Sequence, residues 1–186
     1  MLSLEPQWVA LYTNPRSEKV VESNLLEAGF EVYLPLRREL HTWSDRKKWV
    51  EVPLIKSYIF AKITSNQQIN VMSVRGVSHI VKFNGSVATI PEREIQMMKD
   101  FIAAEVNVQV RTIEQLKYGS RVRIQSGSLE GKEGLLVSDC EDGNFAVEIT
   151  GISMAMIVHV AQEMLEVVNE DENPEPVAKK KKYTIR

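Results

Sequence analysis

The most informative pattern in the sequence is the alternation along residues 57–63, within the stretch VPLIKSYIFAKI at 52–63. Successive side chains of a strand point to opposite faces. One face would carry Ser57, Ile59, Ala61 and Ile63, and the other would carry Tyr58, Phe60 and Lys62. The first set predicts a core face. The second predicts either aromatic cover beneath a helix or a surface on which a partner docks, and we favour the docking surface.

The elements expected around this strand follow the order β-α-β-β-β-α-β-β-α, which favours an α+β sandwich with an antiparallel sheet. The other strands are expected at 8–13, 30–36, 49–52, 78–83 and 87–90. Asn84-Gly85 is the turn expected between the last two strands. The basic segment Arg37–Lys48 is expected at a hairpin tip, where it is either a solvated loop or a source of phosphate contacts.

Three helices are expected in this part. The first has Asn14 as N-cap and Pro15 as its first residue, and it would bury Val21, Leu25 and Ala28 before Gly29. The second begins with a capping box of Ser65 and Gln68, carries Ile69 and Met72 on one face, and ends before Gly76. The third opens at Pro91, with Ile95, Met98 and Ile102 in register.

The pattern changes after the third helix. Residues 106–115 predict a linker, although their alternating valines also suit a short strand. Five short strands separated by glycine turns follow and predict a small barrel. These strands are expected at 121–125, 135–138, 145–149, 154–158 and 164–168. The acidic, Pro-containing and lysine-rich tail at 169–186 is expected to be disordered.

Composition and charge narrow the range of functions. The 186 residues are 44% hydrophobic and 26% charged, as in an ordinary globular protein, and the net charge of −2 gives no global basic field. Nucleic-acid contacts would therefore need local patches. The single cysteine cannot form an intrachain disulfide, which suits a reducing cytoplasm. No signal peptide and no membrane-spanning run is expected, so the predicted location is cytoplasmic.

Catalytic motifs are missing from the sequence. The three histidines are isolated and only one cysteine is present, so no metal site is expected. Gly127–Gly131 followed by Lys132 superficially resembles a P-loop, but its glycines are one residue too close and Glu133 replaces the magnesium-binding hydroxyl. A β-turn is the better interpretation. We therefore expect no enzyme, no catalytic residue and no cofactor.

Four segments, in their order along the chain, resemble the NusG family of transcription elongation factors. They are Trp8–Tyr12 followed by Asn14, PLIKSYIF at 53–60, VRGV at 74–77, and VRIQSGSLEGKEGLL at 122–136, where Gly134 matches the KOW glycine. The resemblance covers nearly all of 8–168 and implies an NGN-like α/β sandwich at 1–105, a linker at 106–115 and a five-stranded KOW (SH3-like) barrel at 116–168. The run RGVSH at 75–79 with Lys82-Phe83 is most similar to the specialised antiterminators of the RfaH kind, and the general architecture also resembles the UpxY-type antiterminators of capsular polysaccharide operons.

The resemblance also implies partners. The family's NGN domain binds the clamp helices of the largest RNA polymerase subunit through an apolar concavity. The matching positions, with their neighbours, are Tyr12, Leu54, Ile55, Tyr58 and Phe60. Core packing is the alternative role for Tyr58 and Phe60. Bridging the clamp to the opposite lobe of the polymerase would hold the enzyme closed over nucleic acid and suppress pausing.

Specialised members also contact the non-template DNA strand. This implies nucleic-acid contacts by Asn14, Arg16, Asn24 and Arg75, with a helix-end cation as the alternative role of Arg75. The family's base-reading positions fall on Asn24 and Glu27, and an acidic residue at the second does not suit base reading. Residues 65–68 (SNQQ) stand where the family's His-Thr-Thr motif contacts the polymerase lobe.

The KOW domain implies Rho or ribosomal protein S10 as a further partner. Lys132 replaces an aromatic residue near the KOW glycine, which weakens an apolar contact with either of them. The barrel is expected as the ground state, and the chain is expected to be a monomer. The resulting functional prediction is a transcription antitermination and elongation factor for specific operons such as surface polysaccharide genes. The alternative is a KOW-type RNA- or ribosome-binding protein that uses Arg121, Arg123 and the lysine tail.

Overall fold

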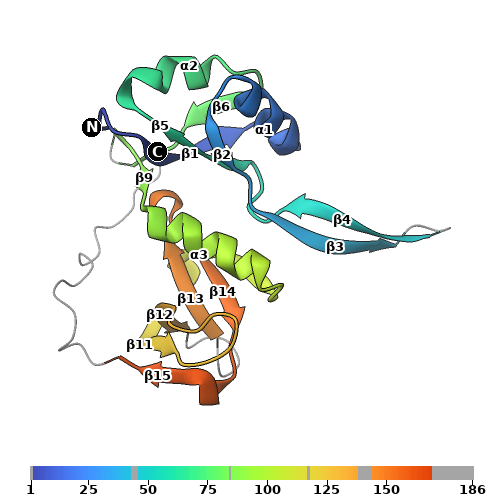
Figure 1. Cartoon of the computed structure of the whole chain (residues 1–186), viewed down its shortest axis with the longest axis vertical. Coiled ribbons are helices and arrows are strands. Elements are labelled where there is room, and N and C mark those ends of the chain that lie inside the picture. The colour runs from blue at the N-terminus through green and yellow to red at the C-terminus, as the bar shows by residue number, and fades with distance from the viewer. Residues whose placement is uncertain (1, 43–45, 84, 117, 138–143, 169–186) are drawn as a thin grey trace.

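The computed structural model describes residues 2–42, 46–83, 85–116, 118–137 and 144–168. Two antiparallel sheets lie at opposite ends of the molecule, with helix α3 (Glu92–Ala103) between them. A long two-stranded ribbon projects sideways from the first sheet (Figure 1). The fold is therefore of the α+β class, as the sequence predicts.

The first sheet is centred on β1 (Gln7–Thr13), which pairs with three other strands. Its strand order is β2-β5-β1-β6, with β9 also paired to β1, and every pairing is antiparallel. The other strands of this sheet are β2 (Glu31–Tyr33), β5 (Tyr58–Ile63), β6 (Val77–Ile80) and β9 (Thr89–Ile90).

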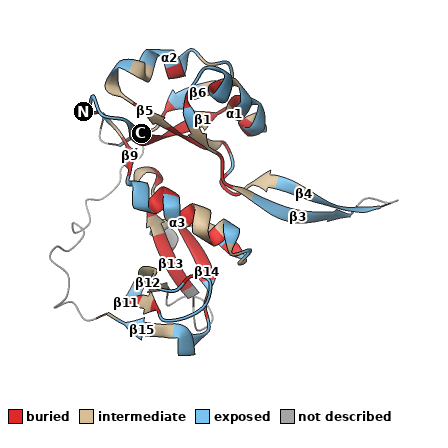
Figure 2. Cartoon of the chain, viewed as in Figure 1, coloured by how far each residue is buried: buried red, intermediate tan, exposed pale blue. Residues whose placement is uncertain are grey.

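The alternation along β5 is confirmed. Ile59, Ala61 and Ile63 are fully buried in one cluster with residues of helix α1 (Glu18–Glu27). Phe60 is also fully buried, but it lies in a second cluster on the opposite face of the sheet. Both faces of the central strands are therefore covered, as the red segments of Figure 2 show.

Helix α1 begins later than predicted. Arg16 has a φ of +61°, which breaks the helical conformation, and the Ser17 amide bonds to the Asn14 carbonyl to form a turn. Pro15 thus occupies the second position of a turn rather than the first position of a helix. The predicted burial of Val21 and Leu25 is confirmed, whereas Ala28 is exposed.

The end of α1 is as predicted. Gly29 has a φ of +83° and its amide bonds to the Leu26 carbonyl, while the Phe30 amide bonds to the Leu25 carbonyl. This pair of hydrogen bonds is a Schellman motif, which places Phe30 against Leu25 in the core.

The second helical segment differs from the prediction in its cap, and the face with Ile69 and Met72 is not the buried one. It consists of a 3-10 turn at Ser65–Gln67 and a short helix α2 at Gln68–Met72. The capping box joins Thr64 to Gln67 and so lies one residue earlier than expected. Val71 is the buried side chain, while Ile69 and Met72 are exposed.

The ribbon is formed by β3 (Leu36–Thr42) and β4 (Lys47–Pro53). It is longer than predicted, because the strand expected at 30–36 divides into β2 and β3 at Leu34-Pro35 and the basic segment itself is extended. A smaller hairpin follows β6, with β7 (Lys82–Phe83) paired to β8 (Ser86–Val87) as predicted. Its turn residue Asn84 lies outside the described residues.

The second sheet contains all five strands expected from the C-terminal glycine-rich pattern. The segment 106–115 contributes a sixth, β10, so the short-strand alternative describes it better than a plain linker. The order is β10-β14-β13-β12-β11-β15. The bounds are β10 (Val108–Thr112), β11 (Tyr118–Ile124), β12 (Glu133–Val137), β13 (Asn144–Ile149), β14 (Met154–His159) and β15 (Leu165–Val167).

Three 3-10 turns complete this half of the chain. They lie at Ile113–Gln115 (η2), Thr150–Ile152 (η3) and Gln162–Met164 (η4). The tail expected to be disordered, 169–186, lies outside the described residues. The domain boundaries at 105 and 115 stay predictions.

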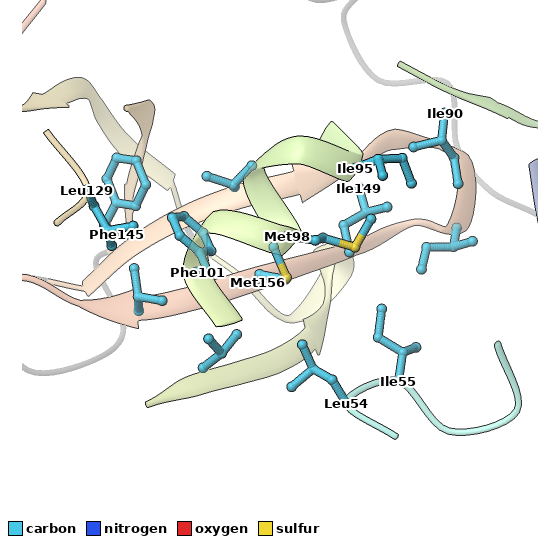
Figure 3. Packing of buried hydrophobic residues seen from close by; sticks show 14 of the residues in the cluster. Leu54, Ile55, Ile90, Ile95, Met98, Phe101, Leu129, Phe145, Ile149 and Met156 are labelled. Carbon is cyan, nitrogen blue, oxygen red and sulfur yellow. The ribbon is translucent and has the colours of Figure 1, made fainter. Parts of the chain in front are cut away.

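A single buried cluster joins the two halves. It contains Trp8 and Phe60 from the first sheet, Met98 and Phe101 from α3, and Phe145 from the second sheet. The predicted burial of Ile95 and Met98 is confirmed, and Ile102 is partly buried against the same cluster. The two sheets therefore share one core through α3 (Figure 3).

Candidate functional site

Three aromatic side chains meet on the surface of the first sheet, across β5, β1 and β6. Tyr12 lies opposite Tyr58 on β5 and opposite His79 on β6. The Tyr12 and Tyr58 rings are edge-to-face with centroids 5.2 Å apart, and the Tyr12 and His79 rings are stacked at 5.1 Å. Both tyrosines are half-buried and His79 is exposed. Burial, followed by the nearby Tyr12, raises the pKa of Tyr58, so its hydroxyl stays protonated at neutral pH.

His79 was not among the residues assigned to this surface from the sequence. It lies in the RGVSH run, but the pairing of β6 with β1 is what brings it against Tyr12. Burial along β6 does not alternate, since Ser78 and His79 are both exposed and Ile80 is buried, so only the apolar Ile80 next to His79 hinted that His79 faces outward. We call Tyr12, Tyr58 and His79 the aromatic patch.

The other three residues assigned to polymerase binding are buried. Leu54 is 7% exposed, Ile55 is 3% exposed and Phe60 is fully buried, all within the cluster that joins the two halves. Figure 3 shows Leu54 and Ile55 directed toward α3 and the strands of the second sheet. The structure thus brings the five predicted residues close in the fold but leaves only Tyr12 and Tyr58 at the surface.

A buried carboxylate holds the loop that carries these residues. Glu18, at the first position of α1, accepts a hydrogen bond from the Ser57 amide at 2.8 Å. The Ser57 carbonyl accepts one from the Thr13 amide at 2.8 Å. Ser57 has a φ of +63°, a conformation that costs a non-glycine residue about 1 kcal/mol or more. These two bonds fix the turn between Ile55 and Tyr58 and so orient both side chains.

The four residues predicted to contact nucleic acid gather at one corner of the first sheet. The Asn24 side-chain amide donates to the Arg75 carbonyl at 3.0 Å, and the Asn14 amide donates to the Gly76 carbonyl at 3.1 Å. Arg16 follows Asn14 in the same turn. Asn14, Arg16 and Arg75 are exposed, while Asn24 is partly buried.

Gly76 is essential to the shape of this corner. It has a φ of +96°, and a Cβ at this position would lie 2.6 Å from Cγ2 of the fully buried Val21. Only glycine permits so close an approach to α1. Because Gly76 packs directly on α1, the preceding residue Arg75 is held at this corner.

Helix α3 is held to both sheets. On the side of the first sheet, the Trp8 indole donates to Glu92 at 2.9 Å, and Lys62 pairs with the same carboxylate at 2.9 Å. The Lys99 ammonium lies over the Trp8 ring at 5.7 Å and over the Tyr33 ring at 5.4 Å. Hydrogen bonding to Lys62 lowers the pKa of Glu92, so this carboxylate is charged at neutral pH.

On the side of the second sheet, Phe101 of α3 meets Phe145 edge-to-face with centroids 6.2 Å apart. Lys132 forms an ion pair with Asp100 of α3. A Cβ on Gly151 would lie 2.7 Å from Ile90 of β9, so η3 touches the first sheet directly. These contacts form the junction that covers Leu54 and Ile55.

The described residues include no group of three or more His, Cys, Asp or Glu that could hold a metal ion. They also include no helix long and apolar enough to cross a bilayer.

The geometry thus combines a two-sheet α+β fold, an aromatic surface patch and an exposed corner that carries Arg16 and Arg75. Residues 6–99 match the family described as NusG, transcription termination factor nusG. The chain therefore belongs to the NusG family, whose members are non-enzymatic transcription factors that act with the RNA polymerase machinery.

Two solved structures are similar to this chain. A structure on domain interaction in Thermotoga maritima NusG has 21% identity and a TM-score of 0.49, covering 88% of this chain and 98% of that one. The MjSpt4:Spt5 complex in conformation A has 16% identity and a TM-score of 0.28, covering 87% of this chain and 97% of that one. No curated protein matches the chain. The family assignment rests on residues 6–99.

Proposed function

We propose that this NusG-family protein binds the clamp helices of the largest RNA polymerase subunit and promotes processive elongation. The observation that carries the proposal is the aromatic patch, where Tyr12 and Tyr58 pack edge-to-face beside the loop fixed by Glu18. Paired, pre-oriented tyrosines bring large contact area at low entropic cost, which is typical of the centres of protein interfaces. The finer role is that of an antiterminator of the RfaH or UpxY kind, acting on specific operons such as those for surface polysaccharides.

The proposed mechanism is binding and not chemistry. A protein that binds the closed clamp more tightly than the open clamp shifts the polymerase toward the closed state. The shift is limited by the difference between the two affinities. Pausing requires the clamp to relax, so the bound factor would favour continued synthesis.

Full engagement of the clamp helices requires the two halves to separate. Leu54 and Ile55 are buried beneath α3 and the second sheet, so they are accessible only after the junction opens. The Lys132–Asp100 ion pair and the Phe101–Phe145 contact would be lost. In this proposal Tyr12 and Tyr58 make the first contact, and Leu54 and Ile55 add to it once uncovered.

We further propose that residues 1–105 bind the polymerase and that 116–168 form a KOW-like unit available to Rho or ribosomal protein S10. The corner formed by Asn14, Arg16, Asn24 and Arg75 would contact the non-template DNA strand, where Arg75 can pair with phosphate or stack on a base. A cytoplasmic, monomeric protein fits this role.

The test is binding of the full chain to purified RNA polymerase elongation complexes. Tyr12→Ala and Tyr58→Ala together should weaken binding at least tenfold, since aromatic interface anchors commonly carry this much. Leu26→Ala, which removes an exposed apolar side chain from α1, is the matched control and should bind like wild type. Thermal unfolding of each variant establishes that it is folded. Equal binding by wild type and the folded double variant would refute the proposed surface.

The alternative, RNA or ribosome binding through Arg121 and Arg123, has weaker support. Nε and Nη2 of Arg123 both donate to Oε1 of Glu133, at 2.9 and 2.6 Å. This guanidinium is therefore occupied within the second sheet. Tight RNA binding together with no affinity for polymerase would favour the alternative.

A further inference from the structure

The ribbon formed by β3 and β4 carries an exposed apolar pair on one face. Leu40 lies directly opposite Trp49 in the strand register, and the two side chains are 47% and 59% exposed. Directly paired residues of an antiparallel ribbon point to the same side. Trp8, the other described tryptophan, is only 2% exposed. A tryptophan as exposed as Trp49 is unusual for a large apolar side chain.

Cations flank this tryptophan on its own face. Lys47 lies two residues from Trp49 along β4, and Arg38 lies diagonally across on β3, one step to the other side. Glu51, the direct partner of Arg38 in the register, shares this face. Alternate residues on a β-strand are about 7 Å apart, so each cation can reach an extended ligand that lies across the Trp49 indole. Neither cation forms an ion pair within the part of the chain that the structure describes.

The opposite face of the ribbon carries Arg37, Glu39, His41 and Lys48. Glu39 pairs with Arg37 and with His41, and its hydrogen bond to His41, assisted by Arg37, lowers its pKa. The described ribbon residues nevertheless keep five cations against two carboxylates, in a chain whose net charge is −2. The cations are Arg37, Arg38, Arg46, Lys47 and Lys48, and the carboxylates are Glu39 and Glu51.

The Trp49 face looks into a groove of about 580 Å³ at the base of the ribbon. Arg38, Trp49 and Leu54 line one wall, and Ile102 and Asn107 line the other. Glu51 and Glu105 are also in the lining. The groove thus combines apolar side chains, an aromatic platform and an amide with donor and acceptor atoms, which suits a nucleobase. Arg38 in the groove lining and Lys47 further along the ribbon are placed to bind the flanking phosphates.

We propose that the β3–β4 ribbon is a binding site for single-stranded nucleic acid, with a base stacked on Trp49 and the flanking phosphates on Arg38 and Lys47. This site is distinct from the aromatic patch and from the Asn14–Arg75 corner. A ribbon can also enter the major groove of duplex DNA, but there bases are stacked inside and cannot cover an indole. The exposed Trp49 between two cations therefore favours an unpaired strand.

The test uses the full chain and fluorescently labelled 12-nucleotide mixed-sequence RNA, the matching single-stranded DNA, and the matching DNA duplex, with binding followed by anisotropy. Trp49→Ala should weaken binding of the single strands roughly tenfold, and Trp49→Phe should retain most of it. Arg38→Gln and Lys47→Gln should each reduce the salt dependence by about 0.7 of a log unit per log unit of salt. Arg93→Gln, an exposed cation on α3, and Leu26→Ala are the matched controls.

The outcomes separate this site from the function proposed above. A Trp49-dependent preference for RNA would point to the transcript, and a preference for single-stranded DNA to a displaced strand; both support the site. Arg75→Gln should leave the Trp49 effect unchanged. Single-strand binding that is the same in wild type and folded Trp49→Ala would overturn the proposal, as would tighter binding of the duplex or no binding at 50 mM salt. Polymerase binding by the Tyr12→Ala/Tyr58→Ala variant is read separately, so the two proposals can fail independently.

Discussion

Lys132 and Asp100 form an ion pair that joins the turn before β12 to helix α3. Both side chains are partly buried at the junction of the two halves. Burial acts to raise the pKa of Asp100, but the hydrogen bonds from Lys132 and Gln96 outweigh it and the pKa is lowered. The aromatic residue that the family resemblance places at position 132 would have no charge to offer this carboxylate. The lysine is thus better explained as an intramolecular contact than as a defect in a partner-binding surface.

The first prediction concerns this ion pair. Lys132→Met and Asp100→Asn should each loosen the junction, and the double variant should show a coupling energy of roughly 0.5–1 kcal/mol in urea unfolding. Glu130→Gln, which neutralises an exposed carboxylate in the same turn, is the control. Because the Asp100 pKa is lowered in the fold, the stabilisation is complete above the ordinary value of 3.8 and is lost as the pH falls through the lowered one. If the losses of unfolding free energy from the two single substitutions simply add in the double variant at neutral pH, the ion pair is contradicted.

The second prediction concerns Glu18. Glu18→Ala should destabilise the protein by about 1–3 kcal/mol, because the Ser57 amide would remain buried without its acceptor. Glu18→Gln keeps an oxygen at the acceptor position and should cost less. Ser57→Gly should be neutral or slightly stabilising, since glycine adopts a positive φ without strain. Chemical denaturation measures all three, and equal losses for Glu18→Ala and Glu18→Gln would argue against the hydrogen bond.

The third prediction separates backbone strain from steric clash at two glycines with positive φ. Gly29→Ala meets no atom within 4 Å and should cost only the strain, about 1 kcal/mol. Gly76→Ala brings the same strain and a contact of 2.6 Å with Val21, so its loss should exceed that of Gly29→Ala by at least about 1 kcal/mol. Val21→Ala in the Gly76→Ala background should recover part of the difference. Thermal unfolding of the wild type and these three variants measures the differences in stability.

The fourth prediction concerns the direct contact of η3 with β9. Gly151→Ala would place a methyl group 2.7 Å from Ile90, so it should force the two halves apart. Small-angle scattering should show a larger radius of gyration, while the circular dichroism of the strands stays unchanged. Ile90→Ala in the same chain removes the contacting Cγ1 and should partly reverse the expansion. A compact Gly151→Ala variant would mean that the junction yields locally.

Much of the fold followed from local patterns. The alternation along β5 was enough to place the core face of Ile59 and Ala61, and the Gly29 signal located the end of α1. The favoured interpretation of the other face as a docking surface did not anticipate the full burial of Phe60. The start of α1 was missed because Asn14-Pro15 serves equally well in a turn, and only the positive φ of Arg16 distinguishes the two. Ile69 and Met72 are three residues apart and share one face of α2 as predicted, but this face is exposed and Val71 is the buried position.

The candidate site was less accessible from sequence. Tyr12 and Tyr58 were identified together, and strand pairing does place them in contact. The covering of Leu54 and Ile55 depends on how α3 and the second sheet dock on the first, and no local pattern encodes that arrangement. The same holds for Lys132 and Asp100, which are 32 residues apart in the chain.

The central place of β1 in the first sheet has a consequence for biosynthesis. About 45 residues separate the end of β1 from the start of its partner β5, and its contact with β9 comes later still. At synthesis rates of about 5–20 residues per second, several seconds pass before the apolar strand WVALY has a strand to pair with, although helix α1 is available to one of its faces sooner. During that time the nascent chain exposes an unpaired, β-prone segment, which a chaperone at the ribosome would bind.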